Sequence, residues 1–440
     1  MILHDCHAEI LAIRAFNFWL LTECRSLLAQ EERAGRSPSE ASSNSTSSFL
    51  RRRYSSSGNN ASLPISNGSS SSWQRFELHP DIKIYMYCTC APCGDASMEL
   101  CMAAQEDATP WDIRDTDDPE KQPALLDGRA YFSRLGVVRR KPCRADADAT
   151  RSKSCSDKLA LRQVSSLLSH ETSLLVAPTQ NTYLAGLILP DIEISRSGCE
   201  RSFGKSGRMK PLNELAWPEY DEQEYGYRFQ PFEILTIPID QFNALWAYGK
   251  PTSQPASPSS PPPEDNAPKK SRPSNQSVIW TLAPSHSSPM TAGKGTRVLP
   301  ILCDSRTGLF ESIVNGVRQG HRASLVGPRG ASALSRARLW GLLRDTLLQE
   351  LDGNDNQARR KSSVGSECHH PHPANELLQL VLEATTYSEL KDISLSNYPF
   401  QARGEAIRTA KGVLKDWIPN SGDESWGLEV LDDPKPKPKR

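Results

Sequence analysis

The chain has 440 residues, and its 52 basic and 52 acidic side chains cancel to no net charge at pH 7. This balance excludes a protein that binds nucleic acid through a net positive charge, so any basic surface must be local. The sequence contains no apolar run of about 18 residues and no basic-then-apolar leader, which predicts a soluble, unsecreted protein of the cytoplasm, the nucleus or both.

Apolar periodicity without Pro or Gly predicts a first helix over 6–32, capped by Asp5, with His7 and Glu9 in its first turn. Residues 82–88 alternate and are rich in β-formers, which predicts a core strand. Residues 105–151 read mostly as loop. The remaining predicted elements are helices over 95–104, 159–168, 331–351 and 376–383, and strands over 182–189, 231–238 and 278–282.

Three polar stretches are too poor in apolar residues to bury a core, and the Lys/Pro-rich tail 431–440 is equally polar. The stretches are 35–72, 251–276 and 352–375. We therefore expect one domain, 1–430, interrupted by three low-complexity insertions. Helices alternating with short strands predict an α/β fold.

Three short motifs, far apart in the chain, predict a metal site. They are His7-Ala8-Glu9, Pro92-Cys93 and Ser154-Cys155. Alone, each reads as a satisfied histidine or a buried thiol. Together, one imidazole and two thiolates leave the fourth position of tetrahedral zinc open, as in catalytic sites, where a bound water has a pKa near 7. Glu9, which is not a ligand in this interpretation, can then move a proton, as in the zinc deaminases of nucleobases.

Two other cysteines are interpreted as core thiols. Cys90 lies before Pro92 on the strand side of the turn, and Cys88 lies on the strand itself. In short-spaced deaminases the second cysteine follows three residues after the first, but that position here is Ala96. The second thiolate must therefore come from further along the chain, and Cys155 is the candidate. An odd total of eleven cysteines in a long unsecreted chain also disfavours a disulfide framework.

Two further clusters carry less weight. The histidines His369, His370 and His372 stand in a polar segment typical of a solvated loop. The basic cluster before the third motif has two open interpretations, contact with phosphates or a solvated loop. Its members are Arg139, Arg140, Lys141 and Arg144.

The motifs resemble those of the RNA adenosine deaminase (editase) family. The residues that carry the resemblance are Leu3-His4-Asp5-Cys6-His7-Ala8-Glu9, Pro92-Cys93-Gly94-Asp95-Ala96 and Ser154-Cys155-Ser156-Asp157-Lys158-Leu159-Ala160. Arg139-x-Lys141-Pro142-x-Arg144-Ala145-Asp146 looks most like the tRNA-specific enzymes of fungi, which convert the adenosine 3′ of the alanine tRNA anticodon to inosine. The resemblance runs from Met1 to about Trp417.

This resemblance implies a cytidine-deaminase-like α/β/α core with a C-terminal extension, and tRNA as the partner. It places Zn²⁺ on His7, Cys93 and Cys155, and gives Glu9 the role of proton carrier. Some family members also bury inositol hexakisphosphate in a basic cavity, an anion that needs a Lys and Arg lining. The positions that match this lining are Arg14, Lys158, Arg336, Tyr387, Lys391 and Trp417, with Arg162 and Arg403 in addition.

Asp5 and Lys158 stand close in sequence to His7 and Cys155, so both are expected to couple that cavity to the metal. The sequence departs from the family pattern at three places. The family has a strand with Gly-Thr-Lys ahead of the first helix, whereas this chain begins six residues before His7. Ile13-Arg14 replaces an Arg pair, and Cys143 replaces a Gly.

Three functions therefore compete. The first is adenosine deamination in tRNA or in another RNA. The second is cytosine deamination by the same metal chemistry, which the long spacing between Cys93 and Cys155 disfavours. The third is an inactive homologue that binds only RNA or an inositol phosphate, which the intact ligand set and Glu9 disfavour.

Overall fold

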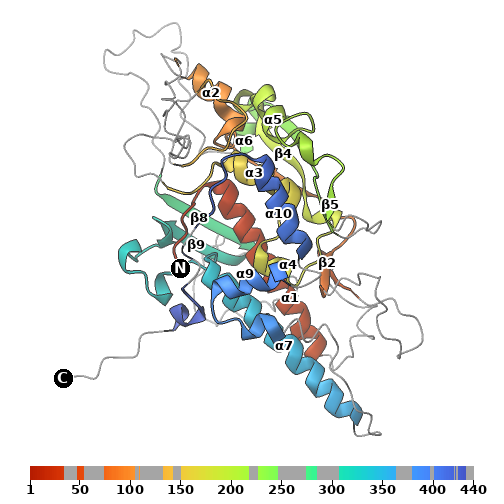
Figure 1. Cartoon of the computed structure of the whole chain (residues 1–440). Coiled ribbons are helices and arrows are strands. Elements are labelled where there is room, and N and C mark those ends of the chain that lie inside the picture. Colours follow the sequence, from red (N-terminus) through yellow and green to blue (C-terminus); the bar gives the residue numbers. More distant parts are fainter. Residues whose placement is uncertain are drawn as a thin grey trace, which may run out of the picture.

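The computed structural model describes residues 1–33, 47–53, 74–104, 109, 132–141, 150–217, 226–245, 274–284, 307–362, 379–396, 401–420, 422 and 425–432. Helices and short sheets alternate along these ranges (Figure 1), which confirms the predicted α/β class. Within them, no helix combines the length and the apolar character that crossing a membrane requires.

The helices are α1 (Ala8–Arg33), α2 (Met98–Ala103), α3 (Cys155–Ser165), α4 (His170–Ser173), α5 (Arg196–Phe203), α6 (Ile239–Leu245), α7 (Arg336–Ser362), α9 (Tyr387–Ser396) and α10 (Gln401–Val413). The strands are β1 (Leu50–Arg52), β2 (Phe76–Leu78), β3 (Ile84–Tyr87), β4 (Leu184–Pro190), β5 (Ala216–Trp217), β6 (Tyr227–Arg228), β7 (Glu233–Ile237), β8 (Gln276–Leu282), β9 (Thr307–Val314) and β10 (Val317–Arg318).

The two larger sheets of the described residues have three strands each. β3, β4 and β7 form a parallel sheet with β4 in the middle, and β10, β9 and β8 form an antiparallel one. β4 is a nearly continuous apolar run, typical of a strand covered on both faces. Its leucines pack with α3, α5 and α10 in one apolar cluster.

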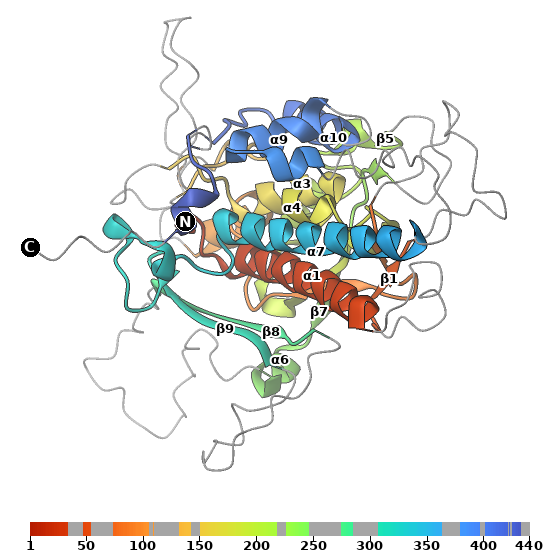
Figure 2. The same ribbon diagram turned by 90° about the horizontal axis from the view of Figure 1, so that it is seen from below.

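Helix α1 connects the two halves of the core. It lies beside α7, with β8 and β9 on another side (Figure 2). Trp19, Leu20 and Leu27 of α1 pack with α7 and α9. Leu11 and Ala15, nearer its start, pack against Ile279 of β8 and the neighbouring strand. The first turns of α1, which carry Glu9, are therefore fixed from several directions.

Several predicted elements are confirmed with small shifts. The helix predicted over 6–32 is α1, and the strand over 82–88 is β3. The helix over 95–104 begins with a 3₁₀ turn, Asp95–Ser97, before α2. β4, β7, β8, α7 and a helical stretch at 379–383 correspond to the other predictions.

Two predicted insertions contain regular structure, which corrects the sequence interpretation. Leu50–Arg52, inside 35–72, forms β1 and pairs with β2. The Arg52 guanidinium is ion-paired to Glu31 at 2.5 Å and to Glu350 at 2.6 Å. Helix α7 also continues to Ser362, into the stretch predicted to be polar and irregular. Most of 251–276 lies outside the described residues.

Candidate metal centre

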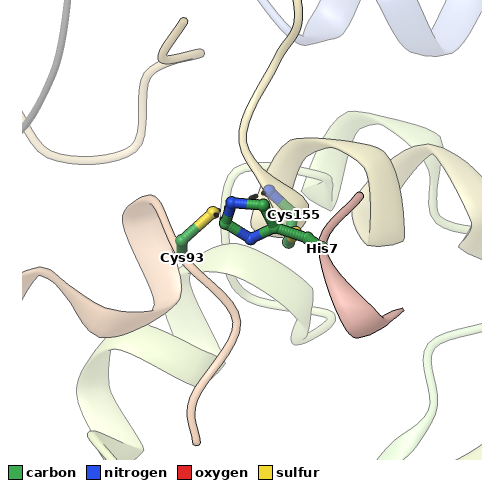
Figure 3. A group of neighbouring side chains, drawn as sticks. All are labelled: His7, Cys93 and Cys155. Carbon is green, nitrogen blue, oxygen red and sulfur yellow. Dashed lines mark hydrogen bonds between the residues drawn. The ribbon is translucent and has the colours of Figure 1, made fainter. Parts of the chain in front are cut away.

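Three side chains from separate elements converge at one point. The ligand atoms of His7, Cys93 and Cys155 all lie within 4.8 Å of one another, and His7 Nδ1 lies 3.7 Å from Cys93 Sγ. Figure 3 shows them pointing together from the start of α1, the turn before α2 and the start of α3. Zinc bonds of about 2.0–2.3 Å in a tetrahedron separate ligand atoms by about 3.5–3.8 Å. The donor set and its spacing therefore fit zinc.

The three candidate ligands differ in how deeply they are buried. Cys155 is fully buried, Cys93 is partly buried and His7 is exposed. Glu9, two residues further along the chain, is partly buried. The site is consequently accessible on the His7 side, while the two sulfurs lie deeper in the protein.

The two cysteine-bearing turns are bonded directly to each other. The backbone N–H of Cys155 donates to Cys93 Sγ at 3.3 Å, and Ser156 Oγ donates to the Cys93 carbonyl at 2.9 Å. Gly94 has a φ of +106°, and a Cβ there would lie 2.2 Å from Ser154 Oγ. Only glycine fits this close approach, which fixes the separation of the two sulfurs.

Helix α3 begins at Cys155, four residues before the predicted start. Its N-cap is Ser154, whose hydroxyl accepts from the Asp157 N–H. The buried Asp157 carboxylate receives the Arg208 guanidinium at 2.6 Å and the Arg139 N–H at 3.0 Å. These contacts hold Cys155 in the first turn of α3, where the backbone N–H groups favour a thiolate.

The two cysteines of the site have opposite pKa shifts. A hydrogen bond from Cys155 holds the pKa of Cys93 well below its ordinary value, and His7 and Lys141 act in the same direction against the effect of burial. The bond to Cys93 raises the pKa of His7. The hydrogen bond to Cys93 and then burial raise the pKa of Cys155, so this thiol keeps its proton while no metal is bound. Metal binding would release that proton.

Lys141 is part of the centre rather than of a solvated loop. Its ammonium lies 3.0 Å from both Asp5 carboxylate oxygens and 3.4 Å from Cys155 Sγ. Burial alone would lower the pKa of Lys141, but Cys93, Cys155 and Asp5 outweigh it and raise the pKa. For Lys141, the interpretation as part of a solvated loop is therefore wrong, and contact with a phosphate stays a prediction. The signal missing from the sequence was its partner Asp5, far away in the chain.

Asp5 connects two lysines and does not cap α1 as predicted. It accepts the His7 N–H at 3.1 Å, but α1 begins at Ala8. Lys158 also contacts the Asp5 carboxylate. Burial would raise the pKa of Asp5, but Lys158 and Lys141 overcome it and lower the pKa to about 2. The carboxylate therefore stays charged.

The two cysteines interpreted as core thiols, the rest of the basic cluster and the histidine cluster are not among the three candidate ligands. Cys88 packs partly buried against the core, and burial raises its pKa. Cys90 is partly buried and is not a member of the ligand cluster. Arg139 is buried and Arg140 partly buried. Arg144 and the histidines His369, His370 and His372 lie outside the described residues.

The arginines expected to surround a polyanion lie together behind the centre. Arg14 donates to the Leu334 carbonyl at 2.9 Å, and Arg162 and Arg403 both donate to the Leu168 carbonyl, at 2.8 and 3.2 Å. Burial lowers the pKa of Arg162 to about 9, with the charges of Arg403 and Arg14 acting in the same direction. Arg403 Nε is buried and has no hydrogen-bond partner among the described residues.

Aromatic rings and further cations continue this cluster. The Arg336 guanidinium lies 5.5 Å and the Lys391 ammonium 5.7 Å from the Tyr387 ring centre. The Tyr387 hydroxyl donates to Glu171 at 2.6 Å. Trp417 is contacted by Lys153 and Lys411, which the sequence reasoning missed. A signal existed for Lys411, since it follows Arg403 by eight residues and shares its face of α10.

Replacing Asp5 by Asn should weaken metal retention about 10–100-fold, as loss of a group behind a metal ligand typically does. The reason is that the Asn amide cannot hold the charged Lys141 against Cys155. Competition with a chelator measures the change. Asp240→Asn, an exposed aspartate on α6, is the control. Equal retention in both variants would contradict a role for Asp5 at the metal.

Comparison with known proteins agrees with the geometry. A family model described as the adenosine-deaminase (editase) domain matches residues 50–300, which include both cysteines of the site. The tRNA-specific adenosine deaminase 1 of Schizosaccharomyces pombe is 28% identical over 423 residues, covering 96% of this chain and 78% of that protein. The protein of the same name from Saccharomyces cerevisiae is 32% identical over 233 residues, 50% of each chain. The similarity to the fungal tRNA-specific enzymes is thereby confirmed, and because the family model matches more than half of its length, the chain belongs to the adenosine-deaminase (editase) domain family.

Proposed function

We propose that this protein is a zinc-dependent hydrolase that deaminates adenosine to inosine in tRNA, at the adenosine 3′ of the alanine tRNA anticodon. The observation that supports this most directly is the convergence of His7, Cys93 and Cys155 beside Glu9. The family membership and the similarity to the two yeast tRNA-specific adenosine deaminases agree with it. Oxygen from water replaces the amino group on C6 of adenine, and ammonia leaves.

In this proposal, His7, Cys93 and Cys155 would hold zinc, which would supply Lewis acidity and lower the pKa of a water. Glu9 would accept a proton from the attacking water and return it to the base. Burial raises the pKa of Glu9 above its ordinary value, which suits a group that must both accept and release a proton. His7 is the exposed ligand, so a flipped-out adenine approaches from its side.

We also propose inositol hexakisphosphate as a second cofactor, bound among Arg14, Arg162, Arg336, Lys391 and Arg403. The support is electrostatic, because desolvated like charges repel unless an anion lies between them. Burial, reinforced by Arg336, lowers the pKa of Arg14 although Glu171 acts in the opposite direction, and Arg403 Nε is buried with no hydrogen-bond partner among the residues that the structure describes. A hexakisphosphate offers the charge and the acceptor oxygens that these groups require.

Lys158 and Asp5 then connect the anion to the metal. Lys158 contacts Asp5, and Asp5 holds Lys141 against Cys155. Lys153, whose pKa is lowered to about 8 by burial and then by Lys158 and other cations, lies between Lys158 and Trp417 in the same charge network. The anion would thus tune the thiolate environment indirectly.

The experiment is incubation of the purified, zinc-loaded chain with alanine tRNA, followed by sequencing of the product. Inosine, read as G at the adenosine 3′ of the anticodon, is the expected result. Uridine from a cytosine would instead indicate cytosine deamination. Unchanged tRNA that still binds would indicate an inactive homologue, and inosine at other positions or in other RNAs would correct the substrate.

A further inference from the structure

A strongly basic loop follows the β9–β10 hairpin. Residues 315–344 contain six arginines and one histidine and no acidic residue, although the whole chain has no net charge. Within them we define the basic loop as residues 318–330. Its exposed residues are Arg318, Gln319, Gly320, His321, Arg322, Ser324, Leu325 and Arg329. Leu325 is 83% exposed, more than the other large apolar side chains of the described residues.

The basic loop has a defined conformation. Arg338 on α7 donates to the Pro328 carbonyl at 2.7 Å, and Arg318 donates to the Arg329 carbonyl at 3.4 Å. The His321 ring packs so closely on Gly330 that a Cβ there would lie 3.0 Å from it. The loop therefore presents its charges in a fixed arrangement, which lowers the entropy lost when it binds a partner.

Both ends of the basic loop are attached to the segment that carries His7. Gly316 accepts the Leu3 N–H at 2.9 Å, and its backbone also bonds to the sulfur of Cys6, the residue before His7. Beyond the loop, the Leu334 carbonyl receives the Arg14 guanidinium at 2.9 Å, two turns along α1. Both flanks of the loop are thus bonded to residues that lie within seven positions of His7 in the sequence.

We propose that the basic loop is a substrate-binding surface that contacts the sugar-phosphate backbone of the tRNA. This inference depends on the proposed function. Arg322 and Arg329 would contact phosphates, since guanidinium groups match phosphate geometry. Leu325 would pack against a base or sugar exposed when the target adenosine leaves its stack. The loop would add affinity and fix the orientation of the RNA, while the chemistry stays with the metal centre and Glu9.

The test compares the full-length, metal-loaded chain with the double variant Arg322→Glu/Arg329→Glu. KM for alanine tRNA should rise about 10- to 100-fold with kcat within about twofold, because the loop positions the RNA and does not touch the reacting atoms. The slope of log affinity against log salt should become shallower by about one per lost phosphate contact. The neutral pair Arg322→Gln/Arg329→Gln should show a smaller effect in the same direction.

Arg25→Glu is the matched control. Arg25 is exposed on α1 but lies 18 residues beyond His7, about 27 Å along the helix axis, and its KM and salt slope should be unchanged. If the wild type does not modify tRNA, the proposed function fails. If the wild type is active and the double variant keeps its KM and salt slope, the inference about the loop fails, and an acidic protein partner becomes the alternative to examine.

Discussion

Replacing Glu9 by Gln should reduce deamination by about 10²–10⁴-fold, the contribution of a positioned general acid–base. Gln keeps the size and hydrogen-bonding shape of the side chain but cannot carry a proton. Glu9 lies beside the ligand cluster without belonging to it, and its pKa responds to the charges of both Cys93 and His7. Turnover of alanine tRNA under single-turnover conditions measures the effect on the chemical step.

The metal content of the variant distinguishes proton transfer by Glu9 from binding of zinc by Glu9. The variant should keep about one zinc per chain, because His7, Cys93 and Cys155 supply the ligands. Glu405→Gln, an exposed glutamate on α10, controls for removal of a carboxylate and should keep full activity. Loss of zinc from Glu9→Gln would show that Glu9 is a ligand, and full activity with full zinc would remove it from the mechanism.

The ligand set was readable from the sequence because each ligand stands at a junction that the sequence marks. His7 precedes a long apolar periodicity, Cys93 follows Pro92 after a strand, and Cys155 precedes the helix that was predicted to begin at Leu159. The contacts of Lys141 with Asp5 and Cys155 could not be predicted from the sequence. Lys141 stands in a basic run, and only the folded chain brings its ammonium to Asp5 and Cys155.

In the fold, too, the elements marked by their own residues were predicted, and an element stabilised by distant partners was missed. β3 and β4 are apolar enough to be predicted from their own residues. β1 was missed because polar segments flank it on both sides, and a pairing with β2 and two carboxylates from distant helices stabilise it. Arg52 of β1 lies in a stretch predicted to be polar and irregular, and its partners Glu31 and Glu350 are far away in the sequence. Local composition cannot reveal partners that far apart in the chain.

The second large effect concerns the partly buried arginines Arg162 and Arg403, and the sign of the stability change shows whether an anion is bound. Arg403→Gln should destabilise the protein by about 3–5 kcal/mol if a polyanion lies among these cations, because removing one partner leaves the buried anion undercompensated. Without an anion, the same change would relieve repulsion from neighbours such as Arg162 and would raise stability. Thermal unfolding of the purified proteins therefore distinguishes the two states.

Arg408→Gln provides the matched control, since Arg408 is exposed on the same helix, α10, and its unfolding temperature should change little. Mass spectrometry of acid-denatured wild-type protein should release inositol hexakisphosphate, and Arg403→Gln should carry less of it. A stabilised Arg403→Gln variant, together with wild-type protein that releases no polyphosphate, would eliminate the anion. Burial, Arg403 and Arg14 would then lower the pKa of Arg162 to about 9 with Glu171 as the opposing carboxylate, and the cluster would keep part of its repulsion in the folded state instead of binding a cofactor.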